Sequence, residues 1–230
     1  MNKVHQFASQ KRYAIKIVSS CSQKKDDPNF INIPVMHQFK LPYYEHQKIK
    51  IPSLLTAMEK IYNANPDKII ISTPGPIGLL ALLATKLLHI RSIGVYHTDF
   101  RLQTNGIKQD ESLVSLVDNY TNWFYQQMDE LYVPSLSYMN ILEERGFDRT
   151  KMKIFPRGIE YDNFYPRSQG RSFLMDNYKI NPGKYFLYTG RISHDKNLDI
   201  IMKAFQDLSR EYSDIYLFLV GDGPHREEFQ

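Results

Sequence analysis

The sequence predicts an α/β fold in which a parallel sheet carries helices on both faces. Short apolar runs typical of buried strands alternate with amphipathic helical patterns over short links, and this alternation favours right-handed crossover units. The alternation stops within residues 161–183, which hold two prolines and two glycines but no clear strand, and it resumes at Lys184. We therefore expect two domains, residues 1–165 and 184–230, with the boundary near residues 165–183.

The first domain is expected to alternate strands and helices along its whole length. Residues 68–72, with the sequence KIIIS, are typical of a buried strand, and residues 110–128 form the longest amphipathic pattern. The expected strands are residues 14–20, 68–72, 92–97, 130–133 and 151–155. The expected helices are residues 53–64, 77–89, 110–128 and 137–145.

The second domain is expected to contain one strand-helix-strand unit. Apolar residues recur at helical spacing after residue 197, at Leu198, Ile201, Met202, Phe205 and Leu208. This pattern predicts a helix at 197–212 between strands at 185–188 and 215–220, and residues 224–230 are typical of a helix start. One such unit does not bury both faces of its sheet, so we expect this domain to be incomplete.

Composition excludes several classes of protein. Of the 230 residues, 42% are hydrophobic and 23% charged, as in soluble globular proteins. The net charge of +4 permits contact with phosphates but does not indicate nucleic acid. Cys21 is the only cysteine, which excludes a disulfide framework and fits a reducing, cytoplasmic location. No signal peptide is visible, and residues 69–90 contain too many turn residues for a membrane span.

Two cations stand where a helix begins. Arg191 and Lys196 lie between the strand at 185–188 and the helix at 197–212, near the positive end of the helix dipole. An anion bound at this turn would offset the repulsion, because arginine offers a fork of donors to phosphate oxygens and lysine a point charge. The turn therefore predicts a site for a phosphate or diphosphate, beside the Gly221-Asp222-Gly223 turn that ends the next strand.

Three other strand ends carry polar or glycine-rich turns. Residues 72–76, STPGP, are interpreted either as a phosphate-approaching loop or as a plain rigid turn. His97 follows a buried strand and is interpreted as a proton carrier, a structural histidine or, with Asp99, half of a metal site. Arg157 is either functional or simply exposed to solvent.

The best-known nucleotide-binding fingerprints are absent. Gly221 and Gly223 begin a Gly-x-Gly pattern, but the next glycine that a dinucleotide fingerprint requires falls at Arg226. No Walker loop occurs in the sequence. These absences disfavour a nicotinamide dehydrogenase and a P-loop enzyme.

The combination of segments resembles family 4 glycosyltransferases of the GT-B fold. The resemblance lies in STPGPIGLLALLATKLL, GVYHTDF, PRGIEYDNFYP and YTGRISHDKNLDIIMKAF followed by LVGDGP. It implies an α/β, GT-B-like architecture of two Rossmann-like domains, the second incomplete, with the active site between them. It also implies a nucleotide-diphosphate sugar donor and retention of anomeric configuration, usually without a metal, and no other cofactor is expected.

The resemblance also implies roles for particular residues. Arg191 and Lys196 would hold the donor diphosphate and stabilise the charge that develops on the leaving nucleotide. His97 would lie near the transferred sugar, and Gly190 and Gly221 would let the backbone approach the donor. The HTDF segment is similar to that of enzymes that glycosylate lipids or build cell-envelope glycans, so a lipid or glycan acceptor is expected.

The sequence departs from the family pattern in two places. The first strand with its glycine-rich loop is not found near Met1, and the Glu-x7-Glu segment of the second domain is not found before Gln230. We therefore expect a partial chain that is inactive alone. The alternatives are a non-catalytic chain that binds a partner or a nucleotide sugar, and a sugar-phosphate or nucleotide-binding α/β enzyme of another family.

The acceptor side offers one further signal. Residues 38–52 are basic and aromatic, which is compatible with peripheral contact at the inner face of a membrane and also with a solvated basic loop.

Overall fold

The structure is a computed structural model, and it divides the chain into two compact units, Met1–Arg157 and Gly158–Gln230. It describes residues 13–20, 27–41, 44–100, 111–156, 158, 161–166, 168–179, 181–193 and 196–229. The division comes before residues 165–183, where the sequence analysis placed the boundary. Each unit is described by itself.

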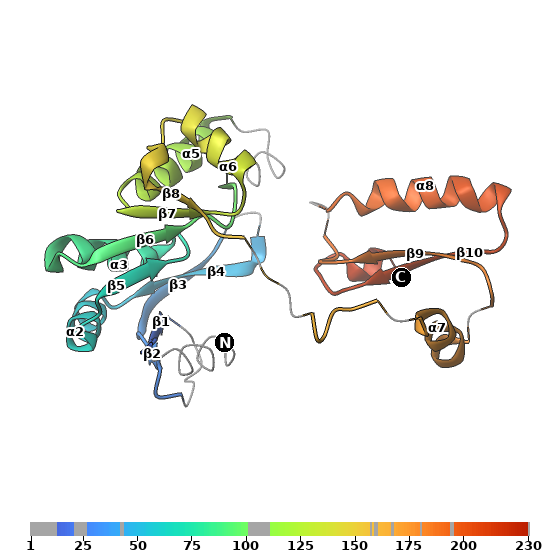
Figure 1. Ribbon diagram of the computed structural model, residues 1–230, viewed down its shortest axis with the longest axis horizontal. Coiled ribbons are helices and arrows are strands. Elements are labelled where there is room, and N and C mark those ends of the chain that lie inside the picture. Colours follow the sequence, from blue (N-terminus) through green and yellow to red (C-terminus); the bar gives the residue numbers. More distant parts are fainter. Residues whose placement is uncertain are drawn as a thin grey trace. The chain divides into compact units, whose positions relative to one another are not determined.

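A parallel sheet of four strands forms the centre of the first unit (Figure 1). Its strands lie in the order β5 (Lys68–Ile71), β6 (Arg91–Val95), β7 (Glu130–Val133) and β8 (Met152–Ile154). The strands follow the chain order because each is joined to the next by a helical crossover. The parallel α/β arrangement expected from the alternating pattern is thereby confirmed.

Among the residues that the structure describes, four helices accompany this sheet. They are α2 (Leu54–Ala64), α3 (Pro76–Leu88), α5 (Glu111–Gln126) and α6 (Leu136–Glu144). Side-chain caps fix two of their starts, because Ser53 accepts a hydrogen bond from the Thr56 amide and Ser135 one from the Tyr138 amide. The core joins α5, α6 and the strands, and its fully buried side chains include Phe124, Tyr125, Val133 and Leu142.

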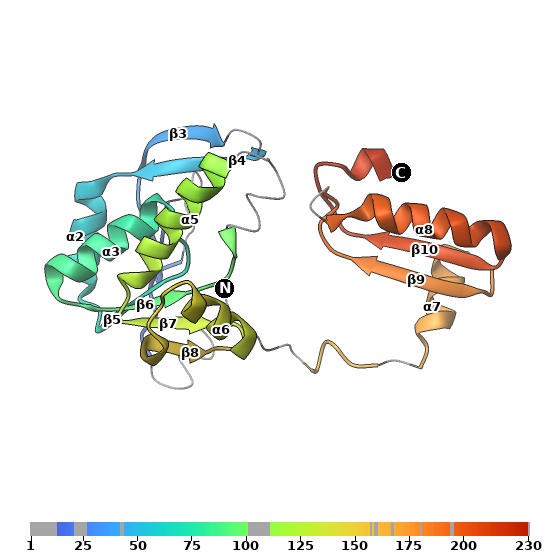
Figure 2. The same ribbon diagram turned by 90° about the horizontal axis from the view of Figure 1, so that it is seen from above.

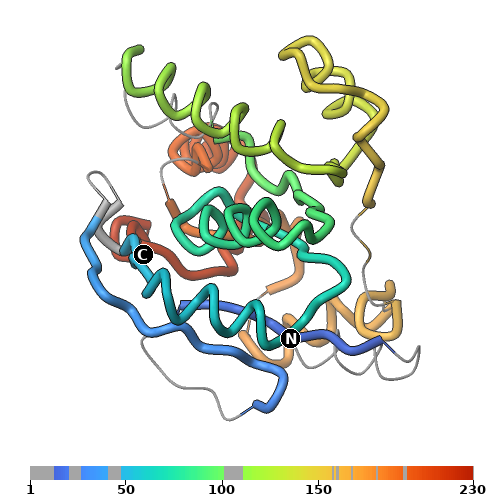
Figure 3. The backbone as a smooth tube through the Cα atoms, turned by 90° about the vertical axis from the view of Figure 1, so that its left-hand side faces the viewer, coloured from blue at the N-terminus to red at the C-terminus, as the bar shows by residue number. Residues whose placement is uncertain are grey.

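Two further pairs of strands precede the sheet in the chain. β1 (Ile17–Ser19) pairs in parallel with β2 (Phe30–Asn32), and β3 (Val35–Leu41) forms an antiparallel hairpin with β4 (Tyr44–Pro52). Figures 2 and 3 show the hairpin, in light blue, beside α2 and α3. A strand at residues 14–20 was expected from the sequence, but β2 and the hairpin were not.

The second unit contains a smaller α/β element. β9 (Lys184–Thr189) pairs in parallel with β10 (Ile215–Val220), and α8 (Leu198–Glu211) connects them. Leu198 is fully buried at the start of α8. The rings of Phe205 and Phe186 meet edge-on, with their centroids 6.2 Å apart. A helix that the sequence analysis did not expect, α7 (Gly170–Tyr178), precedes β9, and a short 3-10 helix, Arg226–Phe229, replaces the expected helix start.

The helices in the described part of the chain were compared with the requirements for spanning a membrane. None of those helices combines the length and the apolar character that crossing a bilayer requires.

Candidate functional site

Two loops at the carboxyl ends of β9 and β10 run side by side. We name them the β9 loop, residues 190–193, and the β10 loop, residues 221–225. The Gly190 amide donates to the Val220 carbonyl at 3.0 Å, and the Ile192 amide donates to the Asp222 carbonyl at 3.0 Å. The hydrogen-bond ladder of the sheet therefore continues past the strands and fixes the two loops against each other.

The glycines of the β10 loop make this close approach sterically allowed. A Cβ atom on Gly221 would lie 1.8 Å from the Gly190 carbonyl oxygen, and one on Gly223 would lie 2.0 Å from the Ile192 carbonyl oxygen. Since both obstacles are backbone atoms, no rotamer change relieves the clash. The structure thus shows that Gly221 packs loop against loop, a role independent of the donor approach that the resemblance implies.

Arg191 is an exposed residue of the β9 loop. The Tyr188 hydroxyl donates to the Arg191 carbonyl oxygen at 2.9 Å, and Arg191 Nε donates to Ser193 Oγ at 3.2 Å. Ser193 itself is buried, so the guanidinium group is tethered at Nε to a fixed point. Ser193 was not among the residues predicted from the sequence, because nothing in its sequence context distinguishes it from an ordinary turn serine.

Lys196 is hydrogen-bonded to the same serine through its backbone amide. The Lys196 amide donates to the Ser193 carbonyl oxygen at 3.0 Å, and the Lys196 side chain is exposed like that of Arg191. Both sequence-predicted cations therefore belong to one turn centred on Ser193. Two cations in one turn raise the local positive potential, which favours an anionic ligand.

α8 begins directly after this turn. Its N-cap residue, Asn197, has a φ of 52°, in the left-handed region, and its side chain makes no capping hydrogen bond. The first turn carries one acid, Asp199. The N-terminal end of the α8 dipole thus adjoins Arg191 and Lys196, and Asp199 offsets a part of that positive charge.

His97 occupies the corresponding place in the first unit, after β6. Its side chain is exposed, whereas those of Tyr96 and Asp99 on either side of it are buried. The Tyr96 amide still pairs with the Tyr132 carbonyl oxygen of β7, at 2.8 Å. We name residues 96–99 the β6 loop. The imidazole of His97 is therefore presented to solvent at the carboxyl end of the sheet, where ligands of parallel α/β sheets bind.

An ion pair holds the β6 loop from the side. Arg145, which caps the C-terminal end of α6, donates to Asp99 Oδ2 at 2.9 Å and to Asp99 Oδ1 at 3.4 Å. The same guanidinium group donates to the Tyr96 hydroxyl at 3.4 Å. Burial and the Asp99 charge raise the pKa of Tyr96 to about 12, so the phenol stays protonated. Because Asp99 is committed to Arg145, the interpretation of His97 and Asp99 as half of a metal site loses support.

The turn after β5 is closely packed against the start of α3. A Cβ atom on Gly78 would lie 2.0 Å from the Thr73 carbonyl oxygen, and the Tyr120 hydroxyl donates to the Pro74 carbonyl oxygen. These contacts account for Gly78 without a ligand. A Cβ atom on Gly75, the glycine of the STPGP turn, would meet only Thr73 Oγ1 at 3.9 Å, so both interpretations of that turn stay predictions. Arg157 lies outside the described residues.

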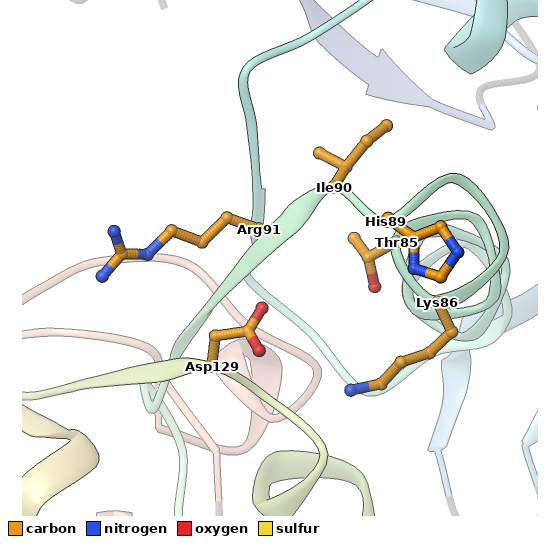
Figure 4. A pocket seen from close by; sticks show the side chains of 6 residues that line it. All are labelled: Thr85, Lys86, His89, Ile90, Arg91 and Asp129. Carbon is orange, nitrogen blue, oxygen red and sulfur yellow. The ribbon is translucent and has the colours of Figure 1, made fainter.

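A cavity of about 540 Å³ lies at the opposite end of the same sheet (Figure 4). It is lined by Thr85, Lys86, His89, Ile90, Arg91 and Asp129. Asp129 accepts hydrogen bonds from the amide and hydroxyl of Ser92, and Lys86 Nζ donates to the Gln127 carbonyl oxygen at 2.7 Å. The cavity lies at the amino ends of β6 and β7, whereas His97 follows the carboxyl end of β6. The charged groups of Lys86 and Asp129 take part in the hydrogen bonds just given, so the cavity is separate from the His97 site.

Comparison with known families agrees with the division of the chain into two units. Residues 5–163 match the model of Glycosyltransferase Family 4, and residues 171–230 match the model of Glycosyl transferases group 1. The first match covers more than half of the chain, and the chain therefore belongs to glycosyltransferase family 4. The resemblance stated from the sequence is confirmed.

The curated relatives of the chain are distant in sequence. The chain is 24% identical to the alpha-monoglucosyldiacylglycerol synthase of Streptococcus pneumoniae, over 89% of this chain and 47% of that protein. It is also 24% identical to the GDP-mannose-dependent alpha-mannosyltransferase of Corynebacterium glutamicum, over 79% of this chain and 41% of that protein. The chain thus spans less than half of the length of these relatives.

Solved structures show the same fold. HepE of Anabaena, crystallised with UDP and glucose, superposes with a TM-score of 0.57 at 15% identity over 76% of this chain and 45% of that chain. A glycosyltransferase of Rickettsia africae superposes with a TM-score of 0.56 at 14% identity over 94% of this chain and 62% of that chain. The expected α/β, GT-B-like class is confirmed, with this chain covering part of the fold.

Proposed function

We propose that the protein transfers a sugar from a nucleotide-diphosphate donor to a lipid or glycan acceptor, with retention of anomeric configuration. The observation that carries the proposal is the β9 loop, where Arg191 and Lys196 share one turn at the N-terminus of α8. Family membership and the sugar-nucleotide ligands of HepE support it. The names of the relatives support an acceptor such as diacylglycerol.

Arg191 and Lys196 act electrostatically in the proposed reaction. The bond between the anomeric carbon and the diphosphate oxygen breaks, and its electron pair stays on that oxygen as negative charge. A bond forms between the anomeric carbon and an acceptor oxygen, and the proton of that acceptor hydroxyl group passes to the released diphosphate oxygen. Arg191 and Lys196 stabilise the charge on the leaving diphosphate, and Ser193 keeps Arg191 in place, so little reorganisation is needed when the charge develops.

His97 is proposed to contact the transferred sugar. A neutral imidazole has one donor and one acceptor nitrogen, so it is able to orient a sugar hydroxyl group. Its exposed position, between the buried side chains of Tyr96 and Asp99, supports this role. Gly190 and Gly221 are proposed to lie beside the donor. A Cβ atom on Gly221 would meet the Gly190 backbone, and one on Gly190 would lie 2.7 Å from the Tyr188 hydroxyl oxygen.

The proposal is tested by sugar transfer with the full-length gene product. Radiolabelled UDP-glucose and GDP-mannose are supplied with a lipid extract, and product is extracted and counted. Arg191→Ala and Lys196→Ala should each reduce kcat by about 10²–10³-fold, as expected for the loss of one preorganised charge-stabilising donor. His97→Ala should lower kcat more than donor affinity.

Arg210→Ala is the matched control. Arg210 is an exposed arginine in the last turn of α8 and is paired with Asp207 at 3.1 Å. Its removal lowers the charge of the second unit by one, as Arg191→Ala and Lys196→Ala do. Transfer should be unchanged in this variant. Near-normal transfer in both the Arg191 and the Lys196 variants would refute the assigned roles.

The hairpin β3–β4 is proposed to contact a membrane at its cytoplasmic face. Lys40 lies directly opposite Lys48 in the pairing register, and Lys50 lies opposite Gln38, so three lysines share one face. Like charges placed opposite each other are destabilising, and an anionic surface would relieve that cost. Phe39, which is paired with Ile49 and is 50% exposed, lies on the other face of the hairpin, so the proposed contact rests on the lysines.

Vesicle sedimentation tests this contact. The protein should bind vesicles that contain phosphatidylglycerol and not vesicles of phosphatidylcholine alone. Lys40→Ala combined with Lys48→Ala should weaken binding by roughly 10–30-fold, since each lysine near an anionic surface contributes about 1 kcal/mol. Lys60→Ala combined with Lys203→Ala removes two exposed lysines elsewhere and should have little effect. Equal loss in both double variants would contradict the assignment to the hairpin.

A further inference from the structure

The β6 loop is held by a side chain that is distant in the sequence. Arg145 belongs to the C-terminal cap of α6, 46 residues after Asp99, and its guanidinium group contacts both Asp99 and the Tyr96 hydroxyl. These two contacts fall on either side of His97 in the chain. One guanidinium group therefore constrains one residue before and one residue after the exposed histidine.

The backbone of Arg145 is itself fixed. Its amide donates to carbonyl oxygens in the last turn of α6, and Gly146, with a φ of 85°, ends the helix directly after it. A second residue of α6, Tyr138, packs its ring 6.0 Å from that of Tyr96, and Tyr125 of α5 packs at 5.2 Å. The position of the β6 loop thus depends on where α6 lies.

The burial of this ion pair argues for a role in positioning. The side chains of Arg145 and Asp99 are only 17% and 4% exposed. A buried ion pair gains little stability over apolar residues of similar volume, because removing both charges from water costs about as much as their attraction returns. What the pair does supply is one specific geometry, since a guanidinium fork meets a carboxylate in a fixed plane.

We infer that Arg145 is a positioning residue for His97. It locks Tyr96 and Asp99 so that the imidazole between them points outward from the carboxyl end of β6. The importance of this geometry for catalysis rests on the proposed function, but the locking itself does not, and it is measured without any substrate.

The test separates locking from folding. Arg145→Met alone would leave Asp99 buried without its main partner and would destabilise the protein. The double variant Asp99→Leu/Arg145→Met removes both charges and keeps similar volumes. Its melting temperature should stay within about 3 °C of the wild type.

The readout is the backbone order parameter of His97 from NMR relaxation. In the wild type it should be about 0.85, as for rigid backbone, and in the double variant it should fall below about 0.6. Arg149→Met is the matched control, because Arg149 follows α6 closely in sequence and makes an exposed ion pair with Glu143. It should leave the order parameter of His97 unchanged.

Two results would overturn the inference. One is an order parameter for His97 that stays near the wild-type value in the double variant. The other is an equal fall in the Arg149→Met control, which would show general loosening of α6. Neither result depends on nucleotide binding, so failure of the inference and failure of the proposed function are distinguishable.

Discussion

The β6 loop and the β9 loop end equivalent strands but are held by different means. Side chains hold the β6 loop, through the Arg145 guanidinium group and the Asp99 carboxylate. Backbone contact holds the β9 loop, where Gly221 and Gly223 admit carbonyl oxygens at distances that no Cβ atom would tolerate. The loop held by side chains carries one exposed residue, His97, between its fixed positions, whereas the loop held by backbone contact carries the exposed side chains of Arg191 and Lys196.

This difference predicts how each loop fails. A loop held by backbone should fail as a whole when any side chain is added at its glycines. A loop held by an ion pair should lose order while the surrounding fold survives, provided that both charges are removed together.

The largest expected effect is on the glycine contact. Gly221→Ala places a methyl group against the Gly190 carbonyl oxygen and should destabilise the second unit by about 3 kcal/mol, the upper end for overpacking. Amide hydrogen exchange measured by mass spectrometry should accelerate across β9 and β10. Fluorescence of Trp123, the only tryptophan and a residue of the first unit, should report unchanged unfolding there.

Gly170→Ala serves as the control for that substitution. Gly170 begins α7, and a Cβ atom added there would meet nothing within 4 Å. Alanine is the better helix former by about 1 kcal/mol in a helix interior, so exchange in the second unit should be unchanged or slower. Equal acceleration in both variants would show that the loop contact is unimportant.

A smaller effect is expected at the other end of β6. The backbone amide of Ser92, and then its hydroxyl, lower the pKa of Asp129 against the opposing effect of burial. Because the folded-state pKa is depressed, this stabilisation is present above the unfolded pKa of about 4 and is lost as the pH falls through the folded value.

Asp129→Asn should therefore lower the free energy of unfolding by about 1 kcal/mol at pH 7, after allowance for the exposure of the side chain. The deficit relative to the wild type should shrink as the pH is lowered below about 4. Urea unfolding at several pH values, followed by Trp123 fluorescence, measures it. A deficit that is constant down to the lowest pH would contradict the charge-assisted bond.

The smallest effect is expected for the tether of Arg191. Ser193→Ala removes the acceptor of the Arg191 Nε hydrogen bond and should weaken the binding of a nucleoside diphosphate by about threefold, since such a bond is exposed on one side. Calorimetric titration with UDP measures the affinity. A loss as large as that of Arg191→Ala would show that Ser193 contacts the ligand itself.

Local patterns in the sequence were sufficient for most of the α/β framework. The runs at β5 and β10 and the helical spacing in α8 depend on neighbouring residues only, and so they were predicted. The hairpin β3–β4 was missed because residues 38–52 were interpreted from their basic and aromatic composition, and the cross-strand pairing of Lys40 with Lys48 is not visible in local spacing.

The turn that carries the two candidate cations was also predictable from the sequence. Arg191 and Lys196 stand within a few residues of each other, so their common turn is visible in the sequence. The contact of Gly221 with Gly190 and that of Arg145 with Asp99 join residues far apart in the chain, and no local spacing signals them.

The central claim, that the β9 loop binds a diphosphate, is tested most directly by a cycle of two ligands and two proteins. UDP and UMP are each titrated calorimetrically into the wild type and into Arg191→Ala/Lys196→Ala. In the wild type, loss of the second phosphate should weaken binding by about 10-fold or more, because charge-assisted bonds contribute about 1.5–3 kcal/mol each. In the double variant, UDP and UMP should bind with nearly equal affinity. The same UDP-to-UMP ratio in both proteins would contradict the claim.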